Sequence, residues 1–328
     1  MNRTTVSAAK WAAVLLTMVV MVLGLSVAAP ARSDELKAAS IYLIPHADDE
    51  FQLWSMFEES ATDFKILVVL TRGEQTQYCE PDAWRAALQE ERGELAPVPA
   101  PEGRWTTQCE SARTNSLLGF LTQMGQSDPG IPGDFAAAKT FGPLEGDAKE
   151  FCRVDAGEPN CSAGNREVTV WLDAQDRGAV VQFNLGDGDL TAQRVTWAMH
   201  ALLANRAEWD LAPEIPVRSI VGAFANDGTQ PCYPYPHADH VAVHEALWNV
   251  DFGVGPQLAA TCLRDSRQSI TRVVRQAASE AAFGEGPDGE RLGAHGRNYG
   301  WLHSDVYQLA FWDEDLFHRV QSFWVRFN

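Results

Sequence analysis

Residues 43–51 read LIPHADDEF, in which an apolar segment is followed at once by a polar, mostly acidic cluster. Residues 39–45 are apolar and rich in strand-forming side chains, which predicts a buried strand of a parallel sheet. One histidine and three acidic residues follow at once, namely His46, Asp48, Asp49 and Glu50. Such a cluster after a buried strand indicates either a solvated turn that caps the next helix or a site for a metal ion.

Strand-like and helix-like segments alternate outward from this stretch. Residues 49–59 have helical spacing and residues 65–71 (KILVVLT) predict a second buried strand, which together make one βαβ unit. Further helices are predicted over residues 109–124, 191–209, 237–248 and 269–283, and further strands over residues 167–172, 179–185 and 217–225. This alternation predicts an α/β fold with a mostly parallel sheet flanked by helices.

The N-terminal segment has the pattern of a secretory signal peptide. Arg3 and Lys10 are followed by an almost wholly apolar run, and residues 29–31 (Ala-Pro-Ala) place small side chains at a cleavage site. We therefore expect residues 1–31 to be removed and the mature chain to be secreted, outside the cell or into the periplasm, without stable membrane association. The alternative is a retained anchor, because the apolar run approaches the roughly 20 residues that a spanning helix needs.

The chain is acidic, with 44 Asp and Glu against 26 Lys and Arg and a formal net charge of −18. A surface of this sign repels nucleic acid and anionic lipid, so neither is an expected partner. Nothing in the sequence indicates the oligomeric state.

Six cysteines lie beyond the predicted signal peptide, at Cys79, Cys109, Cys152, Cys161, Cys232 and Cys262. An even number in an exported chain predicts three disulfides, which would link the long loops. Nearness in sequence suggests the pairs Cys79–Cys109, Cys152–Cys161 and Cys232–Cys262. Zinc binding by these cysteines is the weaker interpretation, because none of them has CxxC spacing.

A second polar cluster stands in PHADH at residues 236–240, after the strand predicted over residues 217–225. It consists of His237, Asp239 and His240. Ligands of open α/β sheets bind beyond the carboxyl ends of the strands, so both clusters are expected at the same edge of the sheet.

Together, PHADDE at residues 45–50 and PHADH resemble the paired motifs of the PIG-L/LmbE-like family of zinc-dependent N-acetylglucosaminyl deacetylases. That family has His-Pro-Asp-Asp-Glu after its first strand and His-x-Asp-His late in the domain, and Ala47 replaces the usual proline here. The segments VVLTRGE, CESARTNSLLGFLTQMG, FNLGDGDLT and SIVGAF keep the family's order between the motifs. The resemblance covers roughly residues 38–250 and implies a Rossmann-like, LmbE-type fold.

We also predict a domain organisation, in which the family core does not explain the last sixty or so residues. Residues 32–265 would form the deacetylase domain, and residues 266–328 a C-terminal extension packed on it. Aromatic residues are frequent in this extension, where they would either complete the core or stack on sugar rings.

A metal centre is implied in which His46, Asp49 and His240 bind Zn²⁺, a His₂Asp set that leaves a position open for water. The same nitrogen and oxygen donors suit Fe²⁺ or Mn²⁺. Asp48 is adjacent to a ligand but projects differently, so it is expected to act as the general base. The opposing interpretation is that Asp48 and Asp49 only cap the following helix.

Five further positions have expected roles by the same resemblance. His237 would stabilise an oxyanion or protonate the leaving amine, and Asp239 would fix the tautomer of His237 or support a metal ligand. Tyr235 would donate to the oxyanion, or else only line its loop. Arg113 and Asp187 would bind substrate, although an ion pair explains the first and turn formation explains the second almost as well.

The implied function is that of a secreted zinc-dependent hydrolase that removes an N-acetyl (acyl) group from an amino sugar or a sugar-containing compound. The expected partner is thus a small-molecule or glycan substrate. Another zinc amidase or an esterase on the same scaffold is one alternative, because metal-activated water attacks many carbonyls. A non-catalytic glycan-binding module with a relic site is another, although such a module has no need of Asp48.

Overall fold

The computed structural model describes residues 36, 38–76, 79–80, 82, 103–146, 153–155, 158–160, 166–226, 234–262, 269–284, 293–295 and 317–327. These residues belong to one compact unit, Leu36–Asn328. The predicted signal peptide, residues 1–31, lies outside the described residues. No helix in the described part of the chain combines the length and the apolar character needed to cross a membrane.

Nine strands in the described residues form one sheet, in the order β10-β11-β9-β8-β1-β2-β7-β6-β3. Their bounds are β1 (Ala38–Ile44), β2 (Asp63–Val69), β3 (Lys139–Phe141), β6 (Val168–Leu172), β7 (Gly178–Gln182), β8 (Val217–Gly222), β9 (Gln257–Thr261), β10 (Ser269–Val273) and β11 (Val320–Arg326). The central strands β9, β8, β1, β2 and β7 run parallel, whereas the pairings at both edges are antiparallel. A separate ribbon pairs β4 (Arg153–Asp155) with β5 (Glu158–Asn160).

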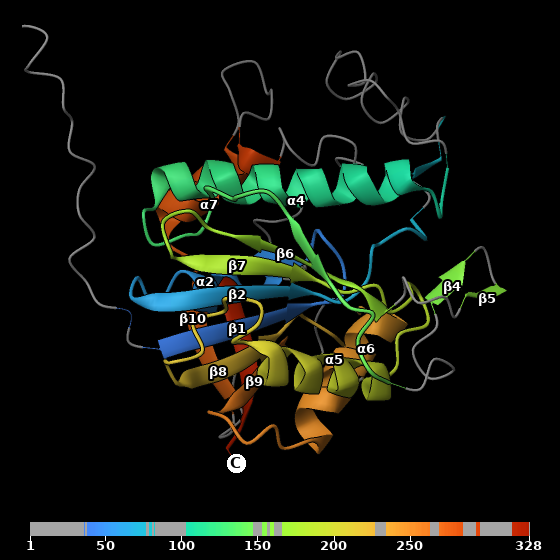
Figure 1. Cartoon of the computed structure of the whole chain (residues 1–328). Helices are drawn as coiled ribbons and strands as arrows, with labels where there is room; N and C mark the ends of the chain where they lie inside the picture. Colours follow the sequence, from blue (N-terminus) through green and yellow to red (C-terminus); the bar gives the residue numbers. More distant parts are fainter. Residues whose placement is uncertain are drawn as a thin grey trace, which may run out of the picture. The chain divides into compact units, whose positions relative to one another are not determined.

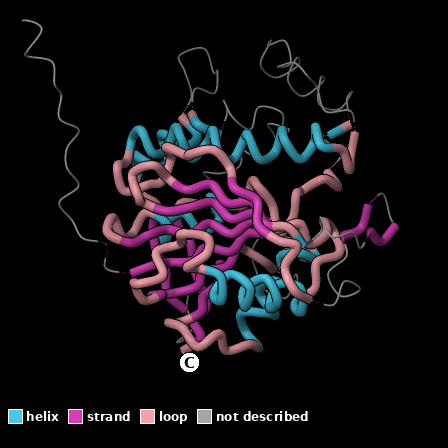
Figure 2. The backbone as a smooth tube through the Cα atoms, viewed as in Figure 1, coloured by secondary structure: helices cyan, strands magenta, loops and turns pink. Residues whose placement is uncertain are grey.

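Helices cover both faces of this sheet (Figure 1). On one face lie α4 (Thr107–Ser127) and α7 (Gln276–Phe283), and on the other lie α5 (Ala192–Asn205) and α6 (Ala238–Asn249). The short elements η1 (Glu50–Leu53) and α2 (Trp54–Phe57) connect β1 to β2. Figure 2 shows the resulting layers, with the strands between the helices.

The apolar pattern of β1 explains why it lies at the centre. All 7 of its residues are buried, and successive side chains alternate between two apolar clusters. Tyr42 and Ile44 belong to the cluster that includes Phe120 of α4, whereas Ile41 and Leu43 belong to the cluster on the opposite face. Burial of apolar area on both faces, at roughly 25 cal/mol per Å², favours a central position for such a strand. The carboxyl end of β1, which leads to the first motif, is therefore firmly held.

The α/β fold with helices flanking a sheet is confirmed, and most predicted elements are present within a few residues of their predicted bounds. The sheet is mixed rather than mostly parallel, because antiparallel strands extend both edges. The helix predicted over residues 269–283 is wrong in its first part, where β10 precedes α7. Ile270, Thr271 and Val273 are β-branched, which favours a strand, and β10 pairs with β11. Two strands from the predicted C-terminal extension thus join the same sheet.

The disulfide predicted between Cys79 and Cys109 is present. It ties the chain that follows β2 to the first turn of α4, and both cysteines are fully buried. Cys262 is also disulfide-bonded. Its predicted partner Cys232 lies outside the described residues, as does the predicted pair Cys152–Cys161.

Candidate active site

The two polar motifs lie at the carboxyl ends of neighbouring parallel strands. His46 and Asp49 follow β1, and the chain that leaves β8 leads to α6, for which His237 is the N-cap residue. One side of β1 pairs with β2, the next strand along the chain, and the other side pairs with β8. Open α/β sheets form a crevice where the strand order reverses in this way, so the fold itself brings both motifs together.

His46, Asp49 and His240 form a buried group that could hold a metal ion. The Nδ1 atom of His46 lies 3.1 Å from Oδ2 of Asp49, and the Nε2 atom of His240 lies 3.3 Å from the same oxygen. Burial opposes ionisation of Asp49, but His240 and His46 outweigh it and lower the pKa of the carboxyl group. An ionised carboxylate faced by two imidazole nitrogens is a suitable donor set for a divalent cation.

The hydrogen bonding of His240 fixes its tautomer. Its Nδ1 atom lies 2.7 Å from the backbone oxygen of Phe224, and a carbonyl only accepts, so Nδ1 carries the hydrogen. Nε2 then presents a lone pair toward Oδ2 of Asp49, and among the described residues it has no hydrogen-bond partner although it is buried. Two facing acceptors repel each other unless a cation or a proton lies between them. The arrangement of His240 and Asp49 therefore fits a metal ion.

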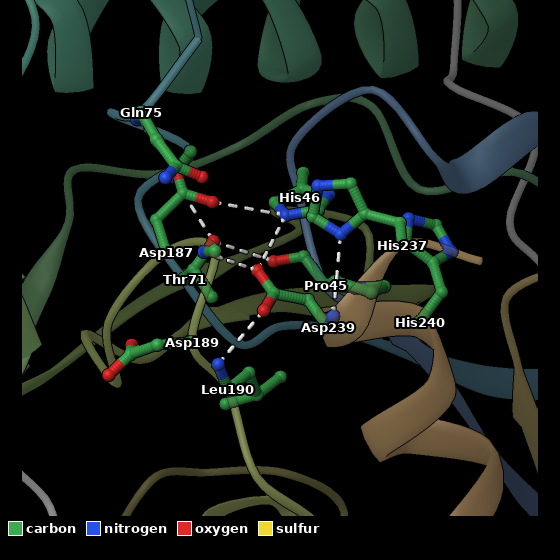
Figure 3. Close-up of polar contacts among 12 residues, drawn as sticks. Pro45, His46, Thr71, Gln75, Asp187, Asp189, Leu190, His237, Asp239 and His240 are labelled. Carbon is green, nitrogen blue, oxygen red and sulfur yellow. Dashed lines mark hydrogen bonds and ion pairs between the residues drawn. The ribbon is translucent and has the colours of Figure 1, made fainter. Parts of the chain in front are cut away.

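The second ring nitrogen of His46, Nε2, contacts two carboxylates. Nε2 lies 3.0 Å from Oδ2 of Asp239 and 3.1 Å from Oδ1 of Asp187 (Figure 3). Burial disfavours the charged ring, but hydrogen bonds to Asp187, Asp239 and Asp49 outweigh it and raise the pKa of His46 well above its usual value. Nδ1 of His46 points toward Oδ2 of Asp49, where a metal ion would take the place of the ring hydrogen. In metal sites, an outer carboxylate commonly orients a histidine ligand in this way through its distal nitrogen.

Asp239 and Asp187 are themselves held by backbone amides. Asp239 accepts from the N–H groups of Gly188 at 2.8 Å and Leu190 at 2.9 Å, and Asp187 accepts from the N–H of Gln75 at 2.5 Å. Burial would raise the pKa of Asp239, but its hydrogen bonds, first of all to the imidazole, lower it to about 2. Gly188 has a φ of +87°, and a Cβ atom there would lie 1.9 Å from the Gln75 side chain, so this turn requires glycine.

Asp48 pairs with Arg113 of α4 rather than with the histidines. The Nη2 atom of Arg113 lies 2.5 Å from Oδ1 of Asp48. The Asp48 side chain is 18% exposed, against 5% for Asp49, so solvent reaches it more readily. Burial raises the pKa of Asp48, and Arg113 opposes this shift. Gly73, at a φ of +64°, makes room for the guanidinium, because a Cβ atom there would lie 2.4 Å from Nε of Arg113.

His237 and Tyr235 lie beside His46 and His240. The ring centroids of His237 and His46 are 4.9 Å apart, and those of Tyr235 and His240 are 4.7 Å apart. Nδ1 of His237 accepts from the N–H of Asp239 at 3.3 Å, which caps α6 and places the ring hydrogen of the neutral form on Nε2. Burial lowers the pKa of His237 and raises the pKa of Tyr235, so the imidazole is neutral and the hydroxyl is protonated at neutral pH.

The structure brings all the site residues named from the sequence to this edge of the sheet. They are His46, Asp48, Asp49, Arg113, Asp187, Tyr235, His237, Asp239 and His240. Asp239 is expected from the sequence either to fix the tautomer of His237 or to support a metal ligand. Its carboxylate contacts His46, whereas only its backbone N–H contacts His237. Sequence reasoning missed Gln52, whose amide contacts Asp49. The available signal was its spacing of three residues from Asp49.

Comparisons with known proteins add little to this geometry. No family model matches the chain, and no curated protein matches it. Among solved structures, the chain is similar to a deacetylase triple mutant described as involved in the teicoplanin biosynthetic pathway, with a TM-score of 0.40 and 11% sequence identity over 89% of this chain and 99% of the other. A likeness of this degree does not transfer an activity, because one fold hosts many functions. The case for a function therefore rests on the residues of the site.

Proposed function

We propose that this chain is a secreted, zinc-dependent hydrolase that removes an N-acetyl group from an amino sugar or a sugar-containing compound. The observation that carries the proposal is the buried contact between Nε2 of His240 and Oδ2 of Asp49, with Nδ1 of His46 beside the same oxygen. Asp48 stands next to this donor set but outside it. Three ligands with an adjacent carboxylate that does not bind the metal suit metal-assisted amide hydrolysis.

The donor set suits a catalytic rather than a purely structural ion, because three protein ligands leave room for water. When bound, the metal would act as a Lewis acid toward the substrate carbonyl and lower the pKa of water. Zn²⁺ is the proposed ion, and Fe²⁺ or Mn²⁺ fits the same nitrogen and oxygen donors.

Asp48 is the general base in this proposal. Its raised pKa and its partial exposure favour the acceptance of a proton from water. Arg113 is proposed to hold the Asp48 carboxylate in place, in addition to the substrate contact expected from the sequence. The base is thereby kept in a fixed orientation next to the ligand Asp49.

Hydrogen-bond donors for the developing charge come from His237 and Tyr235. The neutral His237 ring carries its hydrogen on Nε2 and Tyr235 keeps its hydroxyl proton, so both can donate to an oxyanion or to the leaving amine. Asp239 and Asp187 are assigned to orienting His46. Both oxygens of Asp187 are engaged inside the protein, which favours this role over contact with sugar hydroxyls.

Export is part of the proposal. The predicted signal peptide and the Cys79–Cys109 disulfide support an oxidising compartment. N-terminal sequencing of the exported protein is expected to begin near Arg32. A membrane-bound product that retains Met1 would show an anchor instead.

An acetate-release assay tests the activity. Protein stripped with a chelator and reloaded with Zn²⁺ is expected to release acetate from N-acetylated amino sugars, and the stripped protein is expected to be inactive. Simple esters are assayed in parallel, and hydrolysis of esters without hydrolysis of N-acetylated sugars would favour the esterase alternative. Oligosaccharide binding without acetate release would support the glycan-binding module, and failure to bind metal would refute the proposed centre.

A further inference from the structure

We propose that Gln52 is a positioning residue that ties two of the metal ligands to each other through a single side-chain amide. The inference rests on the proposed metal centre and concerns a residue that neither motif contains. Gln52 lies in η1 and is 2% exposed, so its amide needs partners inside the protein.

Both polar atoms of the Gln52 side-chain amide make hydrogen bonds at the site. Nε2 donates to Oδ1 of Asp49 at 2.8 Å, and Oε1 accepts from the backbone N–H of Phe224 at 2.9 Å. The backbone oxygen of Phe224 in turn accepts from Nδ1 of His240 at 2.7 Å. A chain of hydrogen bonds therefore runs from one ligand, through Gln52 and Phe224, to the other ligand.

The ligand atoms close this chain into a ring, because Nε2 of His240 lies 3.3 Å from Oδ2 of Asp49. Since Gln52 holds Oδ1, the other carboxylate oxygen is the one that faces the histidines. Reversal of the amide would place two donors together at Phe224 and two acceptors together at Asp49, so its orientation is fixed. Gln52 thus selects the ligating oxygen and sets the spacing between the loop after β1 and the exit of β8.

The substitution Gln52→Met tests this role, because methionine keeps the length of the side chain and its burial but makes neither hydrogen bond. Gln321→Met is a matched control. The Gln321 amide also makes two hydrogen bonds to this segment, donating to the backbone oxygen of Phe51 at 2.5 Å and accepting from the N–H of Ser55 at 2.9 Å, without touching a ligand. The two variants therefore lose equal numbers of hydrogen bonds in one region.

Affinity for Co²⁺ is measured by competition with a chelator, together with the visible absorption spectrum of the Co²⁺-loaded protein, which reports coordination geometry. Gln52→Met is expected to bind Co²⁺ roughly 10–100-fold more weakly than the wild type, the usual effect of losing an outer contact of a ligand, and with an altered spectrum. Gln321→Met is expected to keep the affinity and the spectrum of the wild type.

Wild-type affinity and spectrum in Gln52→Met would overturn the inference alone, and so would equal losses in both variants. Absence of Co²⁺ binding by the wild type would overturn the metal centre and this inference together, so the two failures are distinguishable. If Gln52→Met does not fold, Gln52→Asn serves in its place with the same expected loss of Co²⁺ affinity, because it keeps a buried amide that is one methylene too short to reach both Asp49 and Phe224.

Discussion

His240 and His244 lie one turn apart on α6 and face consecutive backbone carbonyls, those of Phe224 and Ala223, at 2.7 and 2.8 Å. Their remaining nitrogens have different surroundings. Nε2 of His240 faces the carboxylate of Asp49, whereas Nδ1 of His244 accepts from an indole N–H of β11 at 3.2 Å. Burial lowers the pKa of His244 to about 4, so it is a neutral residue that links α6 to the sheet.

Metal content is expected to separate these two histidines. His240→Asn keeps a side-chain N–H in place of Nδ1 but has no donor atom in place of Nε2, so stoichiometric zinc binding should be lost. His244→Gln keeps a side-chain N–H in place of its Nε2 and should bind zinc as the wild type does. Elemental analysis of the dialysed proteins measures both. Equal zinc in all three proteins would remove His240 from the ligand set.

Asp48 and Asp49 are neighbours with different proposed roles. Asp48→Asn is expected to keep the metal, because its carboxylate lies outside the donor set, and to lose roughly 10²–10⁴-fold in rate, the usual contribution of a positioned base. Asp49→Asn is expected to lose metal and activity together. Metal content and acetate release are measured on the same preparations. If Asp48→Asn contained no metal while Asp49→Asn kept it, the two assignments would be reversed.

Gly73 and Gly253 test the role of Arg113, because both have a positive φ, of +64° and +68°. A Cβ atom at Gly73 would lie 2.4 Å from Nε of Arg113, whereas at Gly253 it would meet no described atom within 4 Å. Substitution by alanine should cost each variant about 1 kcal/mol of stability from the left-handed conformation. Only Gly73→Ala should also lose activity, because it displaces the partner of Asp48. Equal acetate release by the two variants would count against Arg113.

Asp173, in the turn between β6 and β7, makes stability depend on pH. Its carboxylate pairs with the Arg177 guanidinium at 2.6 and 2.7 Å and accepts from the N–H groups of Gly133 and Asp134 at 2.9 Å each. Burial would raise the pKa of Asp173, but these contacts outweigh it and lower the pKa. A lowered folded-state pKa contributes stability above the unfolded value of ~3.9, and this contribution is lost as pH falls through the folded value.

Asp173→Asn is therefore expected to unfold at lower denaturant concentration than the wild type at pH 7. The difference should shrink as the pH falls from ~4 toward the lowered folded-state pKa of Asp173, because the unfolded wild-type carboxyl group takes up its proton first. Urea titrations at both pH values measure the free energies of unfolding. A difference that stays constant with pH would contradict a role for the ionised carboxylate.

The local elements and the chemical character of the two motifs could be predicted from the amino-acid sequence. The strand over residues 39–45 could be predicted because most of its side chains are apolar and suited to burial on both faces of a sheet, which is a local property. His46, Asp49 and His240 could be named as candidate metal ligands because the paired motifs resemble those of the PIG-L/LmbE-like family, and their donor atoms suit a divalent cation. Neither inference required knowledge of the contacts between residues far apart in the chain.

The pairing of distant strands and the hydrogen-bond partners of the site residues became known from the folded structure. β10 and β11 form strands because they pair with each other across some fifty residues, and local spacing alone predicted a helix for the first of them. The same holds for Asp187, which contacts His46 instead of remaining a turn residue, and for Gln52, which joins Asp49 to the exit of β8. Hydrogen bonds depend on the distance and direction between two atoms, and for residues far apart in the chain those quantities exist only once the sheet has assembled.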